Sequence, residues 1–182
     1  MKRVVLIFGL ISGVISAGLM LAFIPFIDKI GFDKGFVLGY SAIVLSMLLV
    51  FFGVRSYREN VGNGHISFLR AFSVGLLITL ISCALYSVTW QIAYHAFLPD
   101  FFDKYTNYVV SKMKESGSSP QEVSAKLAEM KSLQALNNNP LVGFLLVFLE
   151  PLPVGLLVTL VSALILRRKN KAMSAEQLAT SI

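Results

Sequence analysis

Residues 141–166 read LVGFLLVFLEPLPVGLLVTLVSALIL and contain one charged side chain, that of Glu150. An apolar run of this length is typical of a helix that crosses a bilayer, because about 20 helical residues span the hydrocarbon core. Inside lipid every backbone amide and carbonyl needs a partner within the protein, and runs this long satisfy that need as helices rather than as barrel strands. The stretch therefore predicts a transmembrane helix.

Three earlier apolar runs resemble it, and together they predict an all-α polytopic membrane protein. We expect one domain over residues 1–182, with four transmembrane helices at about 4–27, 35–54, 67–97 and 140–167. The composition agrees, since 55% of the residues are hydrophobic and only 14% are charged, against about 25% charged in a soluble domain. An ordinary soluble domain is therefore excluded.

Motifs for chemistry are missing from the sequence. No pattern for catalysis, for a cofactor or for a metal appears, and the only cysteine, Cys83, lies inside the third apolar run. The formal net charge of +6 does not predict nucleic-acid binding, because the membrane divides the basic residues and they form no single solvated face. We expect no enzyme activity, no cofactor, no metal and no nucleic-acid partner, and we expect contact with the lipid bilayer.

Basic residues gather on one side of the predicted spans. That side holds Lys2, Arg3, Arg55, Arg58, Arg70, Arg167, Arg168, Lys169 and Lys171, opposed only by Glu59 and Glu176. Because Lys and Arg favour cytoplasmic loops, both termini and residues 55–70, a short turn between spans, are predicted to be cytoplasmic. Arg55, Arg58 and Arg70 are expected to contact lipid phosphates.

The long connection at residues 99–139 is predicted to form two amphipathic helices outside the cytoplasm. Apolar residues recur there at helical spacing, first as Phe102, Tyr105, Val109 and Met113. Ser119, Pro120 and Glu122 then read as an N-cap, a proline at the first helical position and a capping-box glutamate. Residues 137–139, three asparagines, break the pattern. A hairpin resting on the membrane surface or on the mouth of the bundle is the first interpretation; a solvated linker is the alternative, because charges of both signs are interspersed.

Small residues recur every four positions in the first span, at Gly9, Gly13 and Ala17. This spacing places them on one helix face, where the backbone of a neighbouring helix can come close. We therefore predict a helix-packing face at these three residues.

The last span carries an acid beside two prolines, in the order Glu150-Pro151-Leu152-Pro153. The prolines predict a kink near Glu150, because each removes a backbone donor and crowds an earlier carbonyl. An acid at this depth is costly and indicates a functional site. The candidate polar site is Glu150, Pro151, Pro153 and Gln91, with Tyr86, Ser87, Thr89 and Gln91 at a depth where they can bond to the acid. The structural interpretation is a protonated Glu150 that donates to a carbonyl freed by the kink. It is preferred over the functional one, because no second intramembrane acid or buried lysine can form a relay with Glu150.

Several further short motifs, spread over nearly the whole chain, are similar to those of a known protein family. They are Tyr57-Arg58, Gly64-His65-Ile66-Ser67-Phe68, Ala71-Phe72 with Gly75, Pro153-Val154-Gly155-Leu156 and Arg167-Arg168-Lys169. With these motifs the chain resembles a family of small bacterial four-span membrane proteins catalogued only as a domain of unknown function. The resemblance implies the bacterial inner membrane and supplies no catalytic residue.

Two function classes remain open from the sequence. The first is a structural or interaction component that packs with itself or with another membrane protein, which fits a small bundle with a packing face and no chemistry. The second is an ion- or proton-coupled transporter or channel component that uses Glu150 at a kinked helix.

Overall fold

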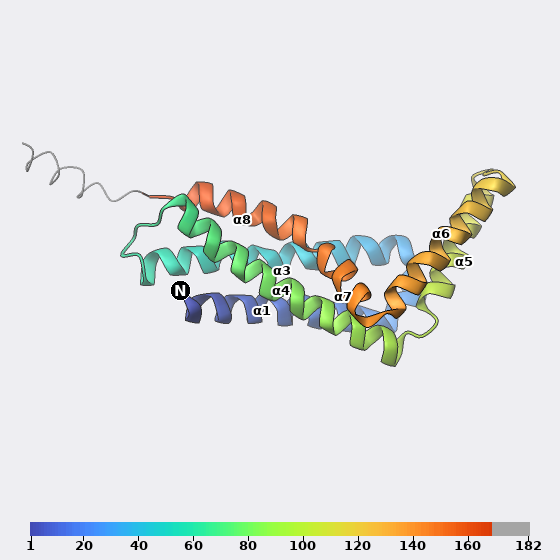
Figure 1. Cartoon of the computed structure of the whole chain (residues 1–182), viewed down its shortest axis with the longest axis horizontal. Coiled ribbons are helices and arrows are strands. Elements are labelled where there is room, and N and C mark those ends of the chain that lie inside the picture. Colours follow the sequence, from blue (N-terminus) through green and yellow to red (C-terminus); the bar gives the residue numbers. More distant parts are fainter. Residues whose placement is uncertain (169–182) are drawn as a thin grey trace, which may run out of the picture.

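The computed structural model describes residues 1–168, so the expectations for Lys169, Lys171 and Glu176 lie outside the described residues. Four long helical segments run side by side, as Figure 1 shows: α1 (Lys2–Phe23), α3 (Phe32–Asn60), α4 (Phe68–Phe97), and α7 (Pro140–Leu149) continued by α8 (Leu152–Leu166). All four are long and apolar enough to cross a membrane. The predicted all-α, four-span fold is confirmed.

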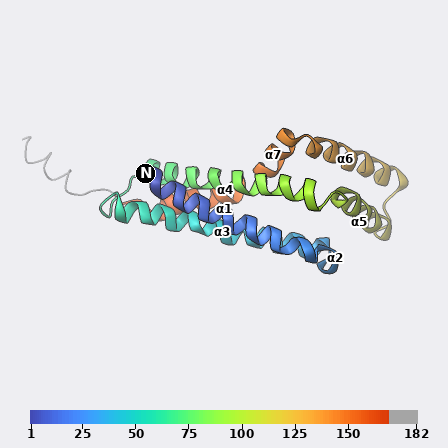
Figure 2. The ribbon, with the colours of Figure 1, turned by 90° about the horizontal axis from the view of Figure 1, so that it is seen from below.

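A short reversal joins the first two long helices. The chain leaves α1 through a 3₁₀ turn (Ile24–Phe26) and the single turn α2 (Ile27–Ile30), and it reverses at Gly31. Gly31 has φ 78°, a conformation that costs glycine little because it has no Cβ. The reversal places the start of α3 against the end of α1, at the end of the bundle away from the N-terminus (Figures 1 and 2).

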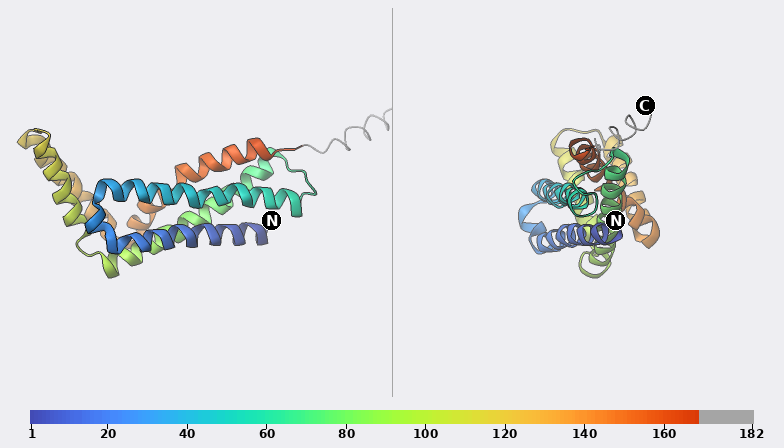
Figure 3. Two further views of the ribbon diagram at one scale, coloured as in Figure 1. Left: turned by 180° about the vertical axis from the view of Figure 1, so that it is seen from behind. Right: turned by 90° about the vertical axis from the view of Figure 1, so that its left-hand side faces the viewer.

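Helix α4 contacts every other long helix of the bundle. It packs on α1, α3, α7 and α8, and half of its most apolar window is buried, against 17% in the fourth span. Seen end-on, the ribbons of the long helices surround a common axis (Figure 3). Hydroxyl groups join them, since Ser12 Oγ donates to Ser46 O at 2.8 Å and lies 2.9 Å from Ser82 Oγ. Such contacts suit a bilayer, where buried polar groups need partners inside the protein.

The connection between α4 and α7 forms the predicted helical hairpin, made of α5 (Phe101–Glu115) and α6 (Pro120–Asn138). The capping box is present, because Glu122 N donates to Ser119 Oγ and Ser119 N donates to Glu122 Oε2. At its base, the ring of Tyr105 lies 5.3 Å from that of Phe32 at the start of α3. The base therefore rests on the mouth of the bundle, while the tip extends away from it (Figures 1 and 3).

An ion pair fastens the hairpin to α3. Lys112 Nζ lies 3.0 Å from Asp33 Oδ2, and both side chains are exposed. The hydrogen bond to the Asp33 carboxylate raises the pKa of Lys112. The contact is solvent-exposed, so it orients the hairpin more than it stabilises it.

Two predicted boundaries are wrong. The second helix does not end at residue 54 but continues to Asn60, and α6 runs through Asn137 to Asn138. Hydropathy marks only where apolar side chains stop, whereas a helix continues as long as its backbone bonds are made. Arg55 and Arg58 consequently lie on the last turns of α3 and not in a loop.

Candidate functional site: an acid at a broken span

The fourth span is interrupted at Glu150 and Pro151, which separate α7 from α8. Proline has no backbone N–H, so neither Pro151 nor Pro153 can donate the helical bond expected at its position. Glu150 N instead donates to Val147 O at 3.2 Å, and the regular pattern resumes where Gly155 N donates to Pro151 O. Glu150 and Pro151 keep helical dihedral angles, with φ −64° and ψ −56° at Glu150 and φ −78° and ψ −14° at Pro151. The helix break is therefore a local loss of backbone hydrogen bonds within a kink, at the place where the prolines predict one.

The break changes the packing partners of the span. Helix α8 packs on both α3 and α4, whereas α7 packs on α4 and on α6 of the hairpin. The result is visible in Figure 1, where α7 turns out of the line of α8. Between α7 and the first half of α3 the bundle is therefore left incompletely filled.

A pocket of about 410 Å³ occupies this space. Its walls come from the end of α1, the first half of α3, α4, the base of the hairpin and α7, and Glu150 lies among them. Aromatic side chains make up a large share of the lining, namely Phe23, Phe32, Phe36, Tyr40, Tyr86, Trp90, Phe101, Phe102 and Tyr105. Pockets of about 300–1,000 Å³ with mainly apolar walls are typical of small-molecule sites.

Glu150 brings the only formal charge to this pocket. The other described side chains of the lining are uncharged, and the Glu150 carboxyl makes no hydrogen bond and no ion pair with any described side chain or backbone group. The structure shows no bond of the kind that the structural interpretation expects, in which Glu150 donates to a carbonyl freed by the prolines. A polar group without a partner at this depth is costly, and a ligand with a complementary charge removes that cost.

The expected polar partners of Glu150 lie elsewhere, with one exception. Tyr86 lines the pocket beside Glu150. Ser87 Oγ donates to Phe144 O at 2.5 Å, and Thr89 Oγ1 donates to Leu85 O at 2.9 Å. Gln91 Nε2 lies 3.4 Å from Asn137 Oδ1, so Gln91 joins α4 to α6 rather than to the acid.

Asn137 is a polar residue of the pocket that the sequence-based interpretation missed. It was expected to lie in a break, yet its side chain is buried at the end of α6 and lines the pocket. Gly143 on α7 allows the approach, because a Cβ there would lie 2.4 Å from Gln91 Nε2. The neighbouring Asn138 accepts from Tyr94 OH at 2.8 Å, and the side chain of Asn139 caps α7. The only sequence signal for these polar contacts was the run of three asparagines before α7, and such a run is equally typical of a loop.

The small residues of the first span pack inside the chain. Gly9 and Gly13 lie against α4, where an added Cβ would come within 2.9 Å of Ile81 and 2.6 Å of Leu85, and Ala17 is buried. This face is thus used for packing α1 on α4 within one chain.

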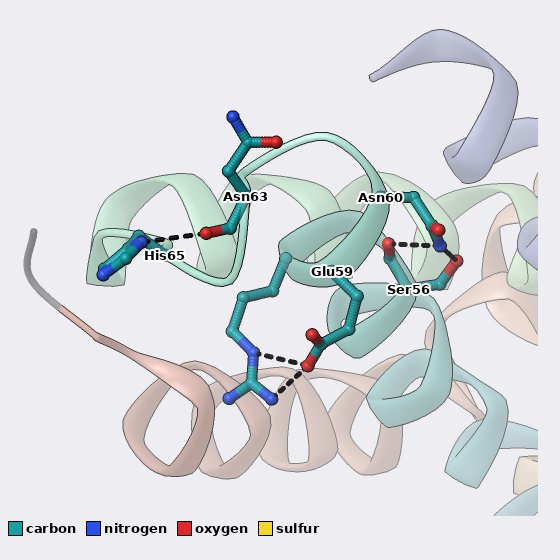
Figure 4. A network of polar contacts seen from close by, with 6 residues as sticks. Ser56, Glu59, Asn60, Asn63 and His65 are labelled. Carbon is teal, nitrogen blue, oxygen red and sulfur yellow. Dashed lines mark hydrogen bonds and ion pairs between the residues drawn. The ribbon is translucent and has the colours of Figure 1, made fainter.

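The three arginines lie at the end of the bundle that holds the N-terminus. Arg58 pairs with the neighbouring Glu59, as Figure 4 shows, while Arg55 and Arg70 are exposed. The adjoining turn is compact: Asn63 has φ 49°, and its carbonyl oxygen lies 3.0 Å from His65 Nδ1. His65 is therefore engaged in the turn itself.

The same turn also pairs with the end of α8. Ile66 N donates to Arg168 O at 3.2 Å, and Arg168 N donates to Ile66 O at 2.9 Å. This pairing fixes α8 beside the start of α4. The two residues form a single antiparallel bridge and lie about a hundred positions apart in the chain. Only the structure reveals this pairing.

No cluster of three or more histidine, cysteine, aspartate or glutamate side chains suited to a metal ion occurs in the described part of the chain. Cys83 is buried in α4. The pocket and its acid are accordingly the strongest candidate site among residues 1–168.

Comparison with known proteins gives one match. A family model described as "Protein of unknown function (DUF4199)" matches residues 7–168. No curated protein and no solved structure matches. The resemblance noted in the sequence, to a family catalogued as a domain of unknown function, is confirmed.

Proposed function

Given that the chain belongs to the DUF4199 family of proteins of unknown function, we propose that it is a structural or interaction component of a membrane. It works by contact with a second copy of itself or with another membrane protein, and not by catalysis. The observation that carries this proposal is the α5–α6 hairpin, whose tip extends beyond the four spans (Figure 1).

The hairpin supports a contact role because its base is held while its outer surface stays free. Aromatic rings and the Lys112–Asp33 pair fix it to α3, so its tip has a defined direction from the bundle. Lys114 and Glu115 near the tip are exposed. Charged side chains of both signs on an exposed helical surface favour selective contact with another protein.

Site-specific photo-crosslinking tests this role. A photo-reactive residue at Lys114 should form a covalent adduct with a protein in native membranes, and the mass of the adduct tells a second copy from another protein. The same residue at Leu164, which is 48% exposed on α8, should give lipid adducts. A chain that elutes as a monomer in mild detergent and yields no protein adduct from Lys114 would contradict the proposal.

We also propose that the protein resides in a bacterial inner membrane, with its termini and the turn after α3 in the cytoplasm. The excess of Lys and Arg at that end supports this orientation. Cysteines at Ser118 and Val61 in a Cys83→Ala background test it. In intact cells an impermeant thiol reagent should label Ser118→Cys only, and labelling of Val61→Cys alone would reverse the orientation.

The second candidate is an ion- or proton-coupled transporter or channel component. It is favoured by the position of Glu150, which lines a pocket at a helix break without a partner in the described chain. Many transporters place such sites at discontinuous helices. In proteoliposomes under a pH or sodium gradient, a wild-type flux that Glu150→Gln abolishes would establish this role, whereas no flux under any gradient would dismiss it.

A further inference from the structure

We propose that the pocket between α3, α4 and α7 binds a hydrophobic organic cation, whose positive group pairs with Glu150. This inference goes beyond the interaction role and does not depend on it, since a chain can associate through its hairpin with the pocket empty or filled.

The sign of the charge is the first argument. Among the side chains that the structure describes, Glu150 is the only formally charged one lining the pocket, and no Lys, Arg or His is among them. An anionic amphiphile such as a fatty acid would find no positively charged side chain among the described lining residues, and its charge would be left unpaired in an apolar space. A cation supplies the partner that residues 1–168 do not give this carboxyl.

The character of the walls is the second argument. Tyr40 and Tyr86 line the pocket with Glu150, and Phe36, Trp90 and Tyr105 extend the aromatic lining. Aromatic faces attract cations through their quadrupole, and cages of such rings are the usual receptors for quaternary ammonium groups. The rings also provide apolar surface for the body of the ligand.

Size and donor set argue against an inorganic ion. Hard cations such as Ca²⁺ take six to eight oxygen ligands and Mg²⁺ takes six, whereas this pocket offers one carboxylate and scattered hydroxyl and amide groups. A volume of about 410 Å³ instead falls within the range of about 300–1,000 Å³ typical of organic ligands.

The ligand has a route from the membrane. Three lining residues keep a large accessible surface, namely Phe36 at 43%, Tyr40 at 48% and Leu146 at 40%. These residues belong to α3 and α7, the two helices that the break leaves apart. The pocket is therefore not sealed, and an amphiphile that partitions into the bilayer can reach it between these two spans.

Trp90 is the only tryptophan of the chain and lines the pocket, so its fluorescence reports on entry of a ligand. The full chain in nanodiscs is titrated with octyltrimethylammonium. Octyldimethylamine N-oxide, which has nearly the same shape and no net charge, is the matched probe. Octyl sulfate serves as the anionic probe. We expect a saturable change with the cation and at least tenfold weaker binding of the N-oxide and of the sulfate.

Substitutions separate the contribution of the Glu150 charge to binding from that of the pocket volume. Glu150→Gln should weaken binding of the cation at least tenfold and leave the N-oxide unchanged, while Glu115→Gln, which removes an exposed acid of α5, should change neither. Gly39→Phe should block both probes, because Gly39 lines the pocket and a Cβ there meets nothing within 4 Å. The Cβ of the new side chain thus has room, and the ring occupies part of the pocket while Glu150 stays in place.

Each outcome decides the proposal. Equal affinity for the cation and the N-oxide, tighter binding of octyl sulfate, or no saturable change in wild type would overturn it. If Glu150→Gln fails to fold, the probe comparison on wild type together with Gly39→Phe still decides. Crosslinking from Lys114 is measured separately, so loss of the interaction role and loss of the cation site are distinguishable.

Discussion

The two halves of the bundle contain the same number of helices but are packed differently. In the half that holds the N-terminus, α8 packs on α3 and α4, and glycines allow close contact between them. In the half next to the hairpin, α7 leaves α3 and a pocket takes its place. The two prolines beside Glu150 separate these halves. The comparison teaches that a local backbone interruption can decide whether a small bundle is closed or holds a cavity.

The largest expected effect is a difference in stability between two glycine substitutions, one in each half of the bundle. A Cβ at Gly155 in the closed half would lie 2.3 Å from Thr79 Cγ2, whereas one at Gly39 in the open half meets nothing within 4 Å. Gly155→Leu should lower the free energy of unfolding by about 3 kcal/mol, at the upper end of overpacking costs, and Gly39→Leu should be tolerated. Thermal unfolding in detergent measures both. Equal losses would mean that the halves are equally tight.

A second substitution tests the packing of α1 on α4. A Cβ at Gly13 would lie 2.6 Å from Leu85 Cδ1, so Gly13→Leu should destabilise the bundle by about 1–3 kcal/mol. Leu10 on the same helix is 47% exposed, and Leu10→Val should change the midpoint of unfolding little. Identical midpoints for the two variants would remove the packing role of the small-residue face.

Straightening the fourth span should close the open half. The double variant Pro151→Ala with Pro153→Ala restores two backbone donors, so α7 and α8 can form one helix. Leu146 lies four residues, or about 6 Å of helix, before Glu150. Removing a kink of about 20° at Glu150 should therefore move Leu146 towards α3 by about 2 Å or more. Spin labels at Leu38 and Leu146 in a Cys83→Ala background report this distance. An unchanged distance would show that α6, and not the prolines, holds α7 away.

A smaller effect is expected at Glu150 itself. Because its carboxyl has no hydrogen-bond partner among residues 1–168, Glu150→Leu should leave the protein as stable as wild type or more stable by about 1 kcal/mol, since burial of an unpaired polar group is unfavourable. Glu150→Gln should stay within about 0.5 kcal/mol of wild type. Chemical unfolding measures both changes. A loss of more than about 1.5 kcal/mol in Glu150→Leu would indicate a structural bond after all.

The smallest effect lies in the hairpin beyond the open half. The backbone amide and the hydroxyl of Ser119 hydrogen-bond the Glu122 carboxylate and hold its pKa below the usual value. Because the pKa of Glu122 is lower in the folded chain, its carboxylate stabilises the cap fully above the pKa of the unfolded chain, which is about 4.3. This stabilisation is lost as the pH falls through the folded pKa. Amide exchange at Val123, corrected for the pH dependence of intrinsic exchange, should therefore lose protection below about pH 4. Ser119→Ala should show low protection already at neutral pH, and a wild-type protection that does not change with pH would contradict the cap.

Sequence alone was sufficient for the number of spans, the hairpin and the position of the break. Apolar runs report directly on transfer into lipid, Ser119 and Glu122 form a local capping pattern, and the prolines remove their donors in any fold. Each of these features depends on residues that are neighbours in the chain, so one sequence contains the whole physical cause.

The tertiary structure alone decided where the small face packs and what surrounds Glu150. Gly9 and Gly13 meet α4, Gln91 meets Asn137, and Tyr40 comes to line a pocket with the acid across more than a hundred residues of chain. The contacts of Gln91 and Tyr40 follow from the way α7 and α8 diverge, which depends on packing against α3, α4 and α6 together. Packing of helices in lipid is driven by shape and by polar contacts between distant segments, and a sequence pattern does not show which segments meet.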